Sequence, residues 1–157
     1  MKTPKALILA VAALTLTGTA ALAHTDEVLA TQKAPNGGQL RMAGAYHFEL
    51  VVARDSKEAK DNPVVVYVTD HAGTKVSTVG AGGTVTILGG KAKASVTLTP
   101  DGDHRLKGVG KYASTPDMKA VVSVTVAGKT AEQARFTPLA PMAPPAAAKD
   151  GHTDHKH

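Results

Sequence analysis

Histidines are concentrated near the C-terminal end of this chain, and imidazole is the commonest transition-metal ligand among side chains. The last eight residues, DGHTDHKH, contain Asp150, His152, Asp154, His155 and His157. Neutral imidazoles and carboxylates suit Cu(II), Zn(II) or Ni(II), and a flexible tail can wrap around an ion. We therefore predict metal ligands at the three tail histidines. The alternative is a solvated, partly protonated tail without a selected role.

His24 is a second candidate ligand, because it becomes the first residue of the mature chain if an N-terminal leader ends at Ala23. Its free α-amine and its ring nitrogen could then chelate one ion together, with Asp26 close by as an oxygen donor. Cleavage one or two residues away would abolish this site. We predict His24 as a metal ligand on the condition that processing follows Ala23.

His47 and Glu49 lie two residues apart in the run YHFELVV, which has the alternating pattern of a β-strand. Residues at positions i and i+2 of a strand share a face. This pair can therefore begin a metal site if a neighbouring strand adds a third ligand, and we predict both residues as candidate ligands. The alternative is an ordinary solvated face, opposite to the apolar face of Tyr46 and Phe48.

Two further histidines, His71 and His104, stand in predicted turns beside Asp70 and Asp103. Turn chemistry alone explains those aspartates, since Asp side chains bond to nearby backbone N–H groups. Loops at the end of a β-domain can meet, but the sequence does not show which loops do. Each of these histidines is therefore a weaker candidate ligand than those of the tail.

Other kinds of chemistry find little support in the sequence. The chain has no cysteine, which excludes disulfides and thiolate sites. Met42, Met118 and Met142 do not form the clustered thioether pattern of a cuprous site, and core packing explains Met42 and Met118 equally well. Neither a G-x-S-x-G nor an H-E-x-x-H motif is present. We predict that the protein is not an enzyme and has no organic cofactor.

Residues 1–23 have the form of a secretory signal peptide, in which Lys2 and Lys5 precede an apolar run that closes with the small residues ALA. The run is too short to cross a bilayer core of about 30 Å. We therefore expect a periplasmic protein without membrane insertion after cleavage. Without the two lysines of this segment the formal charge falls from +5 to +3, and this small excess, with only three tyrosines and two phenylalanines, argues against nucleic-acid binding.

The segments that position these residues are predicted to be short β-strands. Residues 24–33 are polar without a clear period, and we expect a flexible arm there. Behind it, apolar runs alternate with turn residues. The runs are QLRMA, YHFELVVAR, VVVYVTD, VSTV, TVTIL, KASVTLT, RLKGVGKY, KAVVSVTVA and QARFTP. About seven to nine short strands at this spacing predict an antiparallel, immunoglobulin-like β-sandwich over residues 34–138, with a core built mainly from valine.

Two segments follow the predicted domain. Residues 139–151 are a Pro/Ala-rich linker, and residues 152–157 are the histidine tail. In an extended polyproline-like state the linker would reach about 40 Å, at roughly 3.1 Å per residue. A domain of this size has a radius of gyration near 13 Å. The tail can therefore reach almost any point on its own domain.

The segment APNGGQLRMAGAYHFELVV resembles the start of a small β-domain that occurs in adaptor subunits of metal-exporting (RND) pumps and in stand-alone periplasmic proteins. The resemblance rests on Gly37, Gly38, Gly44, Tyr46, His47, Glu49 and Leu50, and continues in VYVTDHAG, KAVVSVTV and ARFTPL. It implies a periplasmic protein of metal homeostasis. The sequence departs from those adaptors in lacking their long helical hairpin, lipoyl-like domain and barrel, so we expect that it cannot bridge a pump by itself.

Two functions are compatible with these residues. The first is a soluble periplasmic protein that sequesters or hands on copper, zinc or nickel ions in heavy-metal homeostasis or resistance. The second is a non-catalytic interaction module of the cell envelope that docks on an efflux adaptor. The second function requires an exposed apolar patch or an unprotected edge strand, and its histidines would be incidental.

Overall fold

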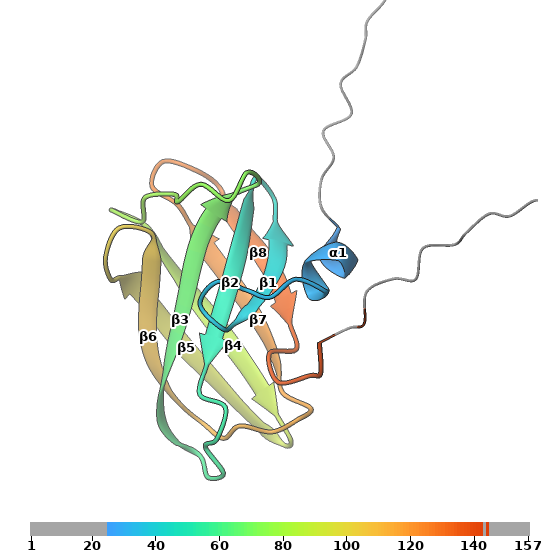
Figure 1. Cartoon of the computed structure of the whole chain (residues 1–157). Coiled ribbons are helices and arrows are strands. Elements are labelled where there is room, and N and C mark those ends of the chain that lie inside the picture. Colours follow the sequence, from blue (N-terminus) through green and yellow to red (C-terminus); the bar gives the residue numbers. More distant parts are fainter. Residues whose placement is uncertain (1–24, 143, 145–157) are drawn as a thin grey trace, which may run out of the picture.

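The protein folds into eight antiparallel strands and one short helix (Figure 1). The structure is a computed structural model that describes residues 25–142 and residue 144. The elements are α1 (Asp26–Ala30), β1 (Gln39–Ala43), β2 (Tyr46–Val52), β3 (Lys60–Asp70), β4 (Gly82–Gly89), β5 (Ala92–Pro100), β6 (Arg105–Tyr112), β7 (Lys119–Thr125) and β8 (Ala131–Phe136). The predicted all-β, antiparallel class is confirmed. Within the described residues, no helix has the length and apolar character to span a membrane.

The strands form one continuous sheet in the order β1-β2-β3-β6-β5-β4-β7-β8. The sheet curls until β1 lies beside β8, which gives it a barrel-like shape (Figure 1). The Gln39 side chain on β1 connects the two ends of the sheet, because its Oε1 accepts a hydrogen bond of 2.8 Å from the N–H of Thr137, directly after β8. An immunoglobulin-like sandwich of two separate sheets is not confirmed.

The sheet remains continuous through a narrow connection between β5 and β6. These strands share only two residue pairs, Thr99 with Lys107 and Pro100 with Leu106. Beyond them, a Cβ atom at Gly108 would lie 2.2 Å from the Thr97 carbonyl oxygen. The missing side chain therefore allows β5 to approach the β6 backbone closely, and the sheet can fold onto itself at this corner.

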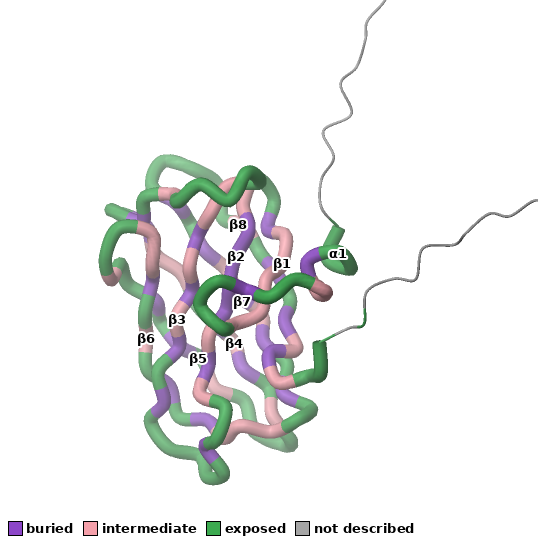
Figure 2. Tube along the Cα trace, in the orientation of Figure 1, coloured by how far each residue is buried: buried purple, intermediate pink, exposed green. Residues whose placement is uncertain are grey.

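The interior is filled by the apolar face that strand alternation predicted. Phe48 and Leu50 are fully buried, and half-buried Tyr46 packs against the same core. Buried and exposed positions alternate along the strands (Figure 2). Half of the twelve largest fully buried side chains are valines, which confirms the predicted composition of the core: Val64, Val66, Val68, Val85, Val96 and Val122.

Two strand predictions were wrong. Residues 76–79 form no named strand, and this connection is instead held by the buried Thr78, whose Oγ1 donates to the Arg105 carbonyl at 3.1 Å. Conversely, β3 begins at Lys60, four residues before the run VVVYVTD from which it was predicted, because residues 60–63 pair with the end of β6. Pairing with a distant segment can extend a strand beyond the run of apolar residues from which it was predicted.

The arm at residues 24–33 also differs from the prediction, because it contains α1 and a buried leucine. Leu29 is only 2% exposed, and the Asp26 Oδ1 accepts a hydrogen bond of 2.8 Å from the Met42 N–H on β1. Asp26 and Glu27 in the first turn suit the positive end of the helix dipole. A helix of five residues is too short to show a period, and tertiary contacts hold it.

Tyr112 connects the last residues of β6 to two neighbouring segments. Its hydroxyl donates to the Pro63 carbonyl at 2.6 Å and accepts from the Ala53 N–H at 3.0 Å. We expect Tyr112→Phe to lower the free energy of unfolding by about 1–2 kcal/mol at neutral pH, because it leaves the Pro63 carbonyl and the Ala53 N–H without this part-buried hydrogen-bond partner. Urea unfolding at pH 7 measures this difference.

The same variant should show a smaller deficit in alkaline solution. Burial raises the pKa of Tyr112 above its ordinary value of 10.0. Above about pH 10 the unfolded chain loses this proton while the folded chain keeps it, so wild-type stability falls as pH rises. The phenylalanine variant lacks this titration. A stability difference that stays constant between about pH 8 and 11 would contradict the assignment.

Candidate functional site

The outer face of β2 and β3 is covered by the N-terminal segment, which crosses it in Figure 1. We call residues 25–38 the strap. Between the strap, the sheet and the turn after β3 lies a cavity of about 520 Å³, with Leu29 and Pro35 on the strap side. We call it the histidine cavity. Its lining includes side chains capable of chemistry: His47, Glu49, Tyr67, His71, Lys75 and His104.

His47 and Glu49 point from β2 into this cavity rather than into solvent. His47 pairs with Thr69 and Glu49 pairs with Tyr67, so these side chains share the outer face of the sheet. The predicted common face is confirmed. The alternative of a solvated face was wrong, because His47 is 7% exposed and Glu49 only 3%. Burial beneath the strap was not visible in the strand pattern.

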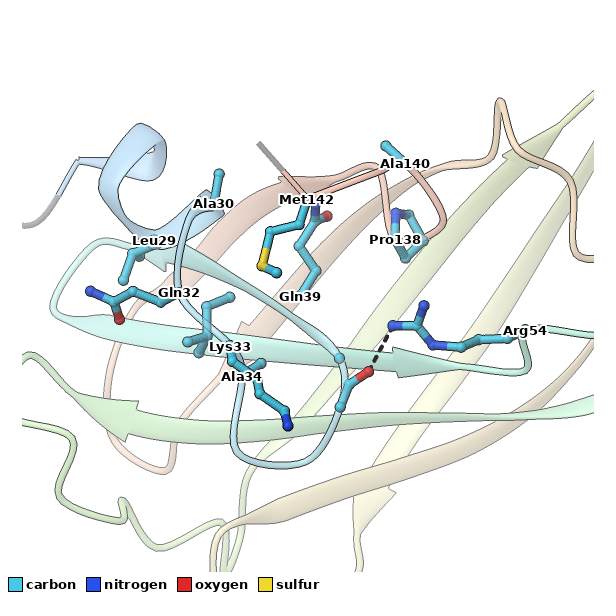
Figure 3. Close-up of a pocket in the computed structure, with 13 residues that line it drawn as sticks. Leu29, Ala30, Gln32, Lys33, Ala34, Gln39, Arg54, Pro138, Ala140 and Met142 are labelled. Carbon is cyan, nitrogen blue, oxygen red and sulfur yellow. Dashed lines mark hydrogen bonds between the residues drawn. The ribbon is translucent and has the colours of Figure 1, made fainter. Parts of the chain in front are cut away.

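The Glu49 carboxylate connects the strap to the sheet through hydrogen bonds. Its Oε1 accepts hydrogen bonds from the backbone N–H groups of Asn36 at 2.8 Å and Gly38 at 2.9 Å, and its Oε2 accepts from the Asn36 amide at 2.8 Å. Arg54 adds a bond of 2.7 Å to the Gly37 carbonyl (Figure 3). Glu49 thus has a structural task that we did not predict, and its role as a metal ligand stays a prediction.

The sequence contains a signal for these hydrogen bonds of Glu49, because only Gly44 and Ala45 separate the runs QLRMA and YHFELVVAR, a spacing typical of a tight hairpin. The two-residue connection after β1 fixes the register in which Leu40 faces Glu49, and Gly38 stands two residues before Leu40. The turn sequence APNGG therefore lies beside the Glu49 side chain. A carboxylate on that strand face is well placed to accept from the N–H groups of the turn.

The turn after β3 holds His71 at the mouth of the cavity. Asp70 Oδ1 accepts from the backbone N–H groups of Ala72 at 2.9 Å and Thr74 at 2.8 Å. The Thr74 bond is the chief reason that the pKa of Asp70 lies below its ordinary value. The predicted turn role of Asp70 is confirmed. The turn is therefore fixed by its own chemistry, and it presents the exposed His71.

The His71 ring has two defined neighbours. It stacks on His47, with ring centroids 5.1 Å apart and an angle of 26° between the planes. Its Nε2 lies 3.1 Å from the Gly44 carbonyl oxygen. Because a carbonyl only accepts, Nε2 carries the hydrogen in this bond. In the neutral ring, Nδ1 is then the nitrogen with a lone pair for a proton or a metal ion.

His104 reaches the same cavity from the turn before β6. Arg105 closes this turn through an ion pair of 2.8 Å with Asp101, and its pKa is raised by a hydrogen bond with Tyr67 and by that aspartate. The His104 carbonyl accepts from the Val68 N–H at 3.0 Å, and its ring lies 5.5 Å from the Tyr67 ring. Pairing of β3 with β6 therefore places the two histidine turns at neighbouring strand ends.

The structure thus gathers all three histidines of its described part, His47, His71 and His104, around one cavity. Of these three rings, those of His47 and His71 stack on each other, whereas the His104 ring lies against Tyr67. In residues 25–142, no three His, Asp or Glu side chains converge closely enough to hold a metal ion. The predicted ligands His24, His152, His155 and His157 lie outside the described residues, as does the predicted signal peptide.

The methionines do not add a thioether site to the cavity. Met118 is fully buried in the core, as packing predicted, and Met142 is 64% exposed. Met42 does not line this cavity and lies beside Asp26, whose carboxylate accepts a hydrogen bond from the Met42 backbone N–H. Asp26 was expected to assist a site at His24, and in the structure it anchors α1 to β1.

Comparison with protein-family models gives no match, and comparisons with curated proteins and with solved structures give no significant match either. The resemblance to the adaptor-associated β-domain therefore stays a prediction. The functional argument rests on the histidine cavity and on the chemistry of its side chains.

Proposed function

We propose that this is a soluble periplasmic metal-binding protein, which sequesters or hands on a divalent copper, zinc or nickel ion. The single observation that carries the proposal is the gathering of His47, His71 and His104 around one cavity. Imidazole nitrogens are suitable ligands for all three metals, whereas the chain offers no thiolate that would compete for them. The rolled β-domain would act as the rigid body of this site.

His71 has the hydrogen-bond arrangement that supports a metal-binding imidazole. Metal-binding histidines commonly donate their second ring N–H to a carbonyl or carboxylate, which fixes the tautomer and the ring direction. The Gly44 carbonyl occupies that position for His71. The exposed turn also allows an ion to approach from solvent, while the His47 ring behind it is buried. We therefore assign the first contact with the ion to His71 and His47.

A site of this kind suits transfer better than permanent storage. Structural zinc sites are closed by four protein ligands, whereas sites with fewer protein ligands keep positions open for exchange. The cavity offers imidazoles without a complete ligand set in the described residues. Its ion could therefore pass to a partner that supplies more ligands, which is the behaviour expected of a hand-over protein.

The test is a titration of the processed chain with Cu(II), Zn(II) and Ni(II), comparing wild type with His71→Ala. We expect at least about a tenfold loss of affinity for the preferred metal, since even a supporting residue of a metal ligand is worth 10- to 100-fold. The metal-free melting temperature should remain nearly unchanged, because His71 is exposed. Lys75→Ala, in the same cavity wall, is the matched control and should retain the affinity.

Two outcomes would overturn the proposed function. One is the absence of binding by wild type at micromolar concentrations of every metal. The other is an affinity that His71→Ala and His47→Gln leave unchanged. His47→Gln keeps a polar side chain at this buried position, and its thermal unfolding shows whether the domain is intact before its metal affinity is interpreted.

A further inference from the structure

We infer that the histidine cavity takes its metal ion together with a small organic carboxylate that chelates the ion, and that Lys33 and Lys75 hold the carboxylate. The inference rests on the proposed function and names the chemical form in which the ion is bound. His47 and His71 would contact the ion, while the two lysines would contact oxygens of the chelator. Ion and chelator would then occupy one cavity as a single complex.

The charge around the cavity is the first argument. Lys33 on the strap and Lys75 after β3 both line it, and both are exposed. Among the described residues of the lining, Glu49 is the only carboxylate, and its oxygens already accept three hydrogen bonds from Asn36 and Gly38. Two ammonium groups repel a bare divalent cation, but they attract an ion whose bound carboxylates give the complex a net negative charge. The lining therefore favours the chelated ion.

The size of the cavity is the second argument. Its volume of about 520 Å³ lies within the range of roughly 300–1,000 Å³ that is typical of small-molecule sites. A water molecule takes about 30 Å³ of liquid volume, so an ion with two or three waters would use only about a fifth of the 520 Å³. A small organic acid bound to the ion matches the cavity much better than the hydrated ion does.

The third argument is the mixture of apolar and polar groups in the lining. Leu29, Pro35 and Leu40 offer apolar contacts to the carbon skeleton of an organic ligand. The Gln32 amide and the Thr69 hydroxyl are further donors for carboxylate oxygens. An inorganic anion such as phosphate would use the lysines but would gain nothing from the apolar wall. The lining therefore favours an organic carboxylate over an inorganic anion.

The number of metal ligands is the fourth argument. His47 and His71 can supply two imidazole nitrogens, and within residues 25–142 no third His, Asp or Glu converges with them. Tetrahedral zinc and tetragonal copper or nickel sites take about four ligands. A chelating carboxylate brings at least two oxygen ligands to the ion. Two imidazoles and one chelator would therefore complete the coordination.

Equilibrium dialysis of radiolabelled citrate against the full processed chain, with and without Zn(II), tests the inference. We expect about one citrate per chain in the presence of Zn(II). Retention without the metal should be at least about tenfold weaker, because binding of the ion and binding of the chelator are coupled in one cavity. His71→Ala should remove most of this dependence on Zn(II), since it removes a contact to the ion.

The lysines are tested by combining Lys33→Gln with Lys75→Gln. This variant should bind zinc citrate about tenfold less tightly at low salt, because two charge-assisted contacts are lost. Its affinity for Zn(II) without citrate should be kept. The matched control combines Lys93→Gln with Lys129→Gln, which removes the same charge from exposed positions outside the cavity lining. The control should bind zinc citrate as wild type does, and both variants should keep the wild-type melting temperature.

The outcomes separate the inference from the proposed function. If Zn(II) binding depends on His71 but citrate only withdraws the ion from the protein, the inference is overturned and the proposed function stands. If citrate is retained equally with and without Zn(II), and no ion binds, both are overturned. Equal losses in the two lysine variants would show a general attraction of charge and would also overturn the inference.

A competition series checks the class of the chelator. In the presence of Zn(II), unlabelled citrate and malate should displace the labelled citrate. Acetate, which offers a single carboxylate, and inorganic phosphate, which has no carbon skeleton, should displace it at least about tenfold less effectively. Displacement by phosphate that is as effective as displacement by citrate would assign the cavity to inorganic anions and overturn the inference.

Discussion

Glu49→Ala is expected to lower the free energy of unfolding by about 3 kcal/mol and to release the strap from the sheet. The wild-type carboxylate accepts three hydrogen bonds from Asn36 and Gly38 while it is 3% exposed. Hydrogen bonds to charged groups contribute about 1.5–3 kcal/mol each, but part of this is recovered when the freed N–H groups reach water. Urea unfolding measures the loss.

Release of the strap has its own readout, because Lys33 lies within it. Trypsin should cut Glu49→Ala after Lys33 much faster than wild type, since local opening exposes the backbone there. The exposed Glu58→Ala is the matched control and should stay within about 0.5 kcal/mol of wild type. Glu49→Gln should be intermediate. Equal cleavage rates at Lys33 in wild type and Glu49→Ala would show that other contacts hold the strap.

The second large effect is expected at the corner of the sheet, where Gly108→Ala should destabilise the domain by about 3 kcal/mol or more. The new Cβ would lie 2.2 Å from the Thr97 carbonyl oxygen and 2.6 Å from Val96 Cγ1. The first of these is backbone, which cannot move aside as a flexible side chain can. Overpacking of this kind forces backbone shifts that typically cost about 1–3 kcal/mol, occasionally more.

Gly82→Ala is the matched control for this corner. Gly82 is also a strand glycine, but a Cβ there would meet no atom closer than 3.9 Å. We therefore expect a change of less than about 1 kcal/mol, and a small gain is possible because alanine restricts the unfolded chain. Thermal unfolding of both variants gives the comparison. Similar melting temperatures for Gly108→Ala and Gly82→Ala would show that β5 and β6 can move apart at Gly108 without loss of stability.

Much of the fold could be predicted because it depends on local sequence patterns. Alternation in YHFELVV gives the side of β2 that faces the core, and the hairpin before it gives the register of β1 and β2. The extra length of β3 could not be predicted, because residues 60–63 are polar and become a strand only by pairing with β6. Local residue preference carries no information about such a partner.

The candidate site was predicted only in part for a related reason. His47 was singled out by its strand position, whereas His71 and His104 were assigned to turns whose meeting the sequence does not reveal. They line one cavity because β3 and β6 are neighbours in the sheet, although β4 and β5 separate them along the chain. Turn chemistry is local, but the order of strands depends on the whole chain.

By itself, the sequence determined the antiparallel β-class, the valine-rich core and the turn role of Asp70, because these depend on residues near one another in the chain. Tertiary structure alone decided that the sheet curls into a barrel-like shape at Gly108 and that the strap buries the outer face of β2. A strand pattern tells which side chains share a face, but the segment that covers this face comes from elsewhere in the chain. Burial of His47 and Glu49 is therefore a property of long-range packing.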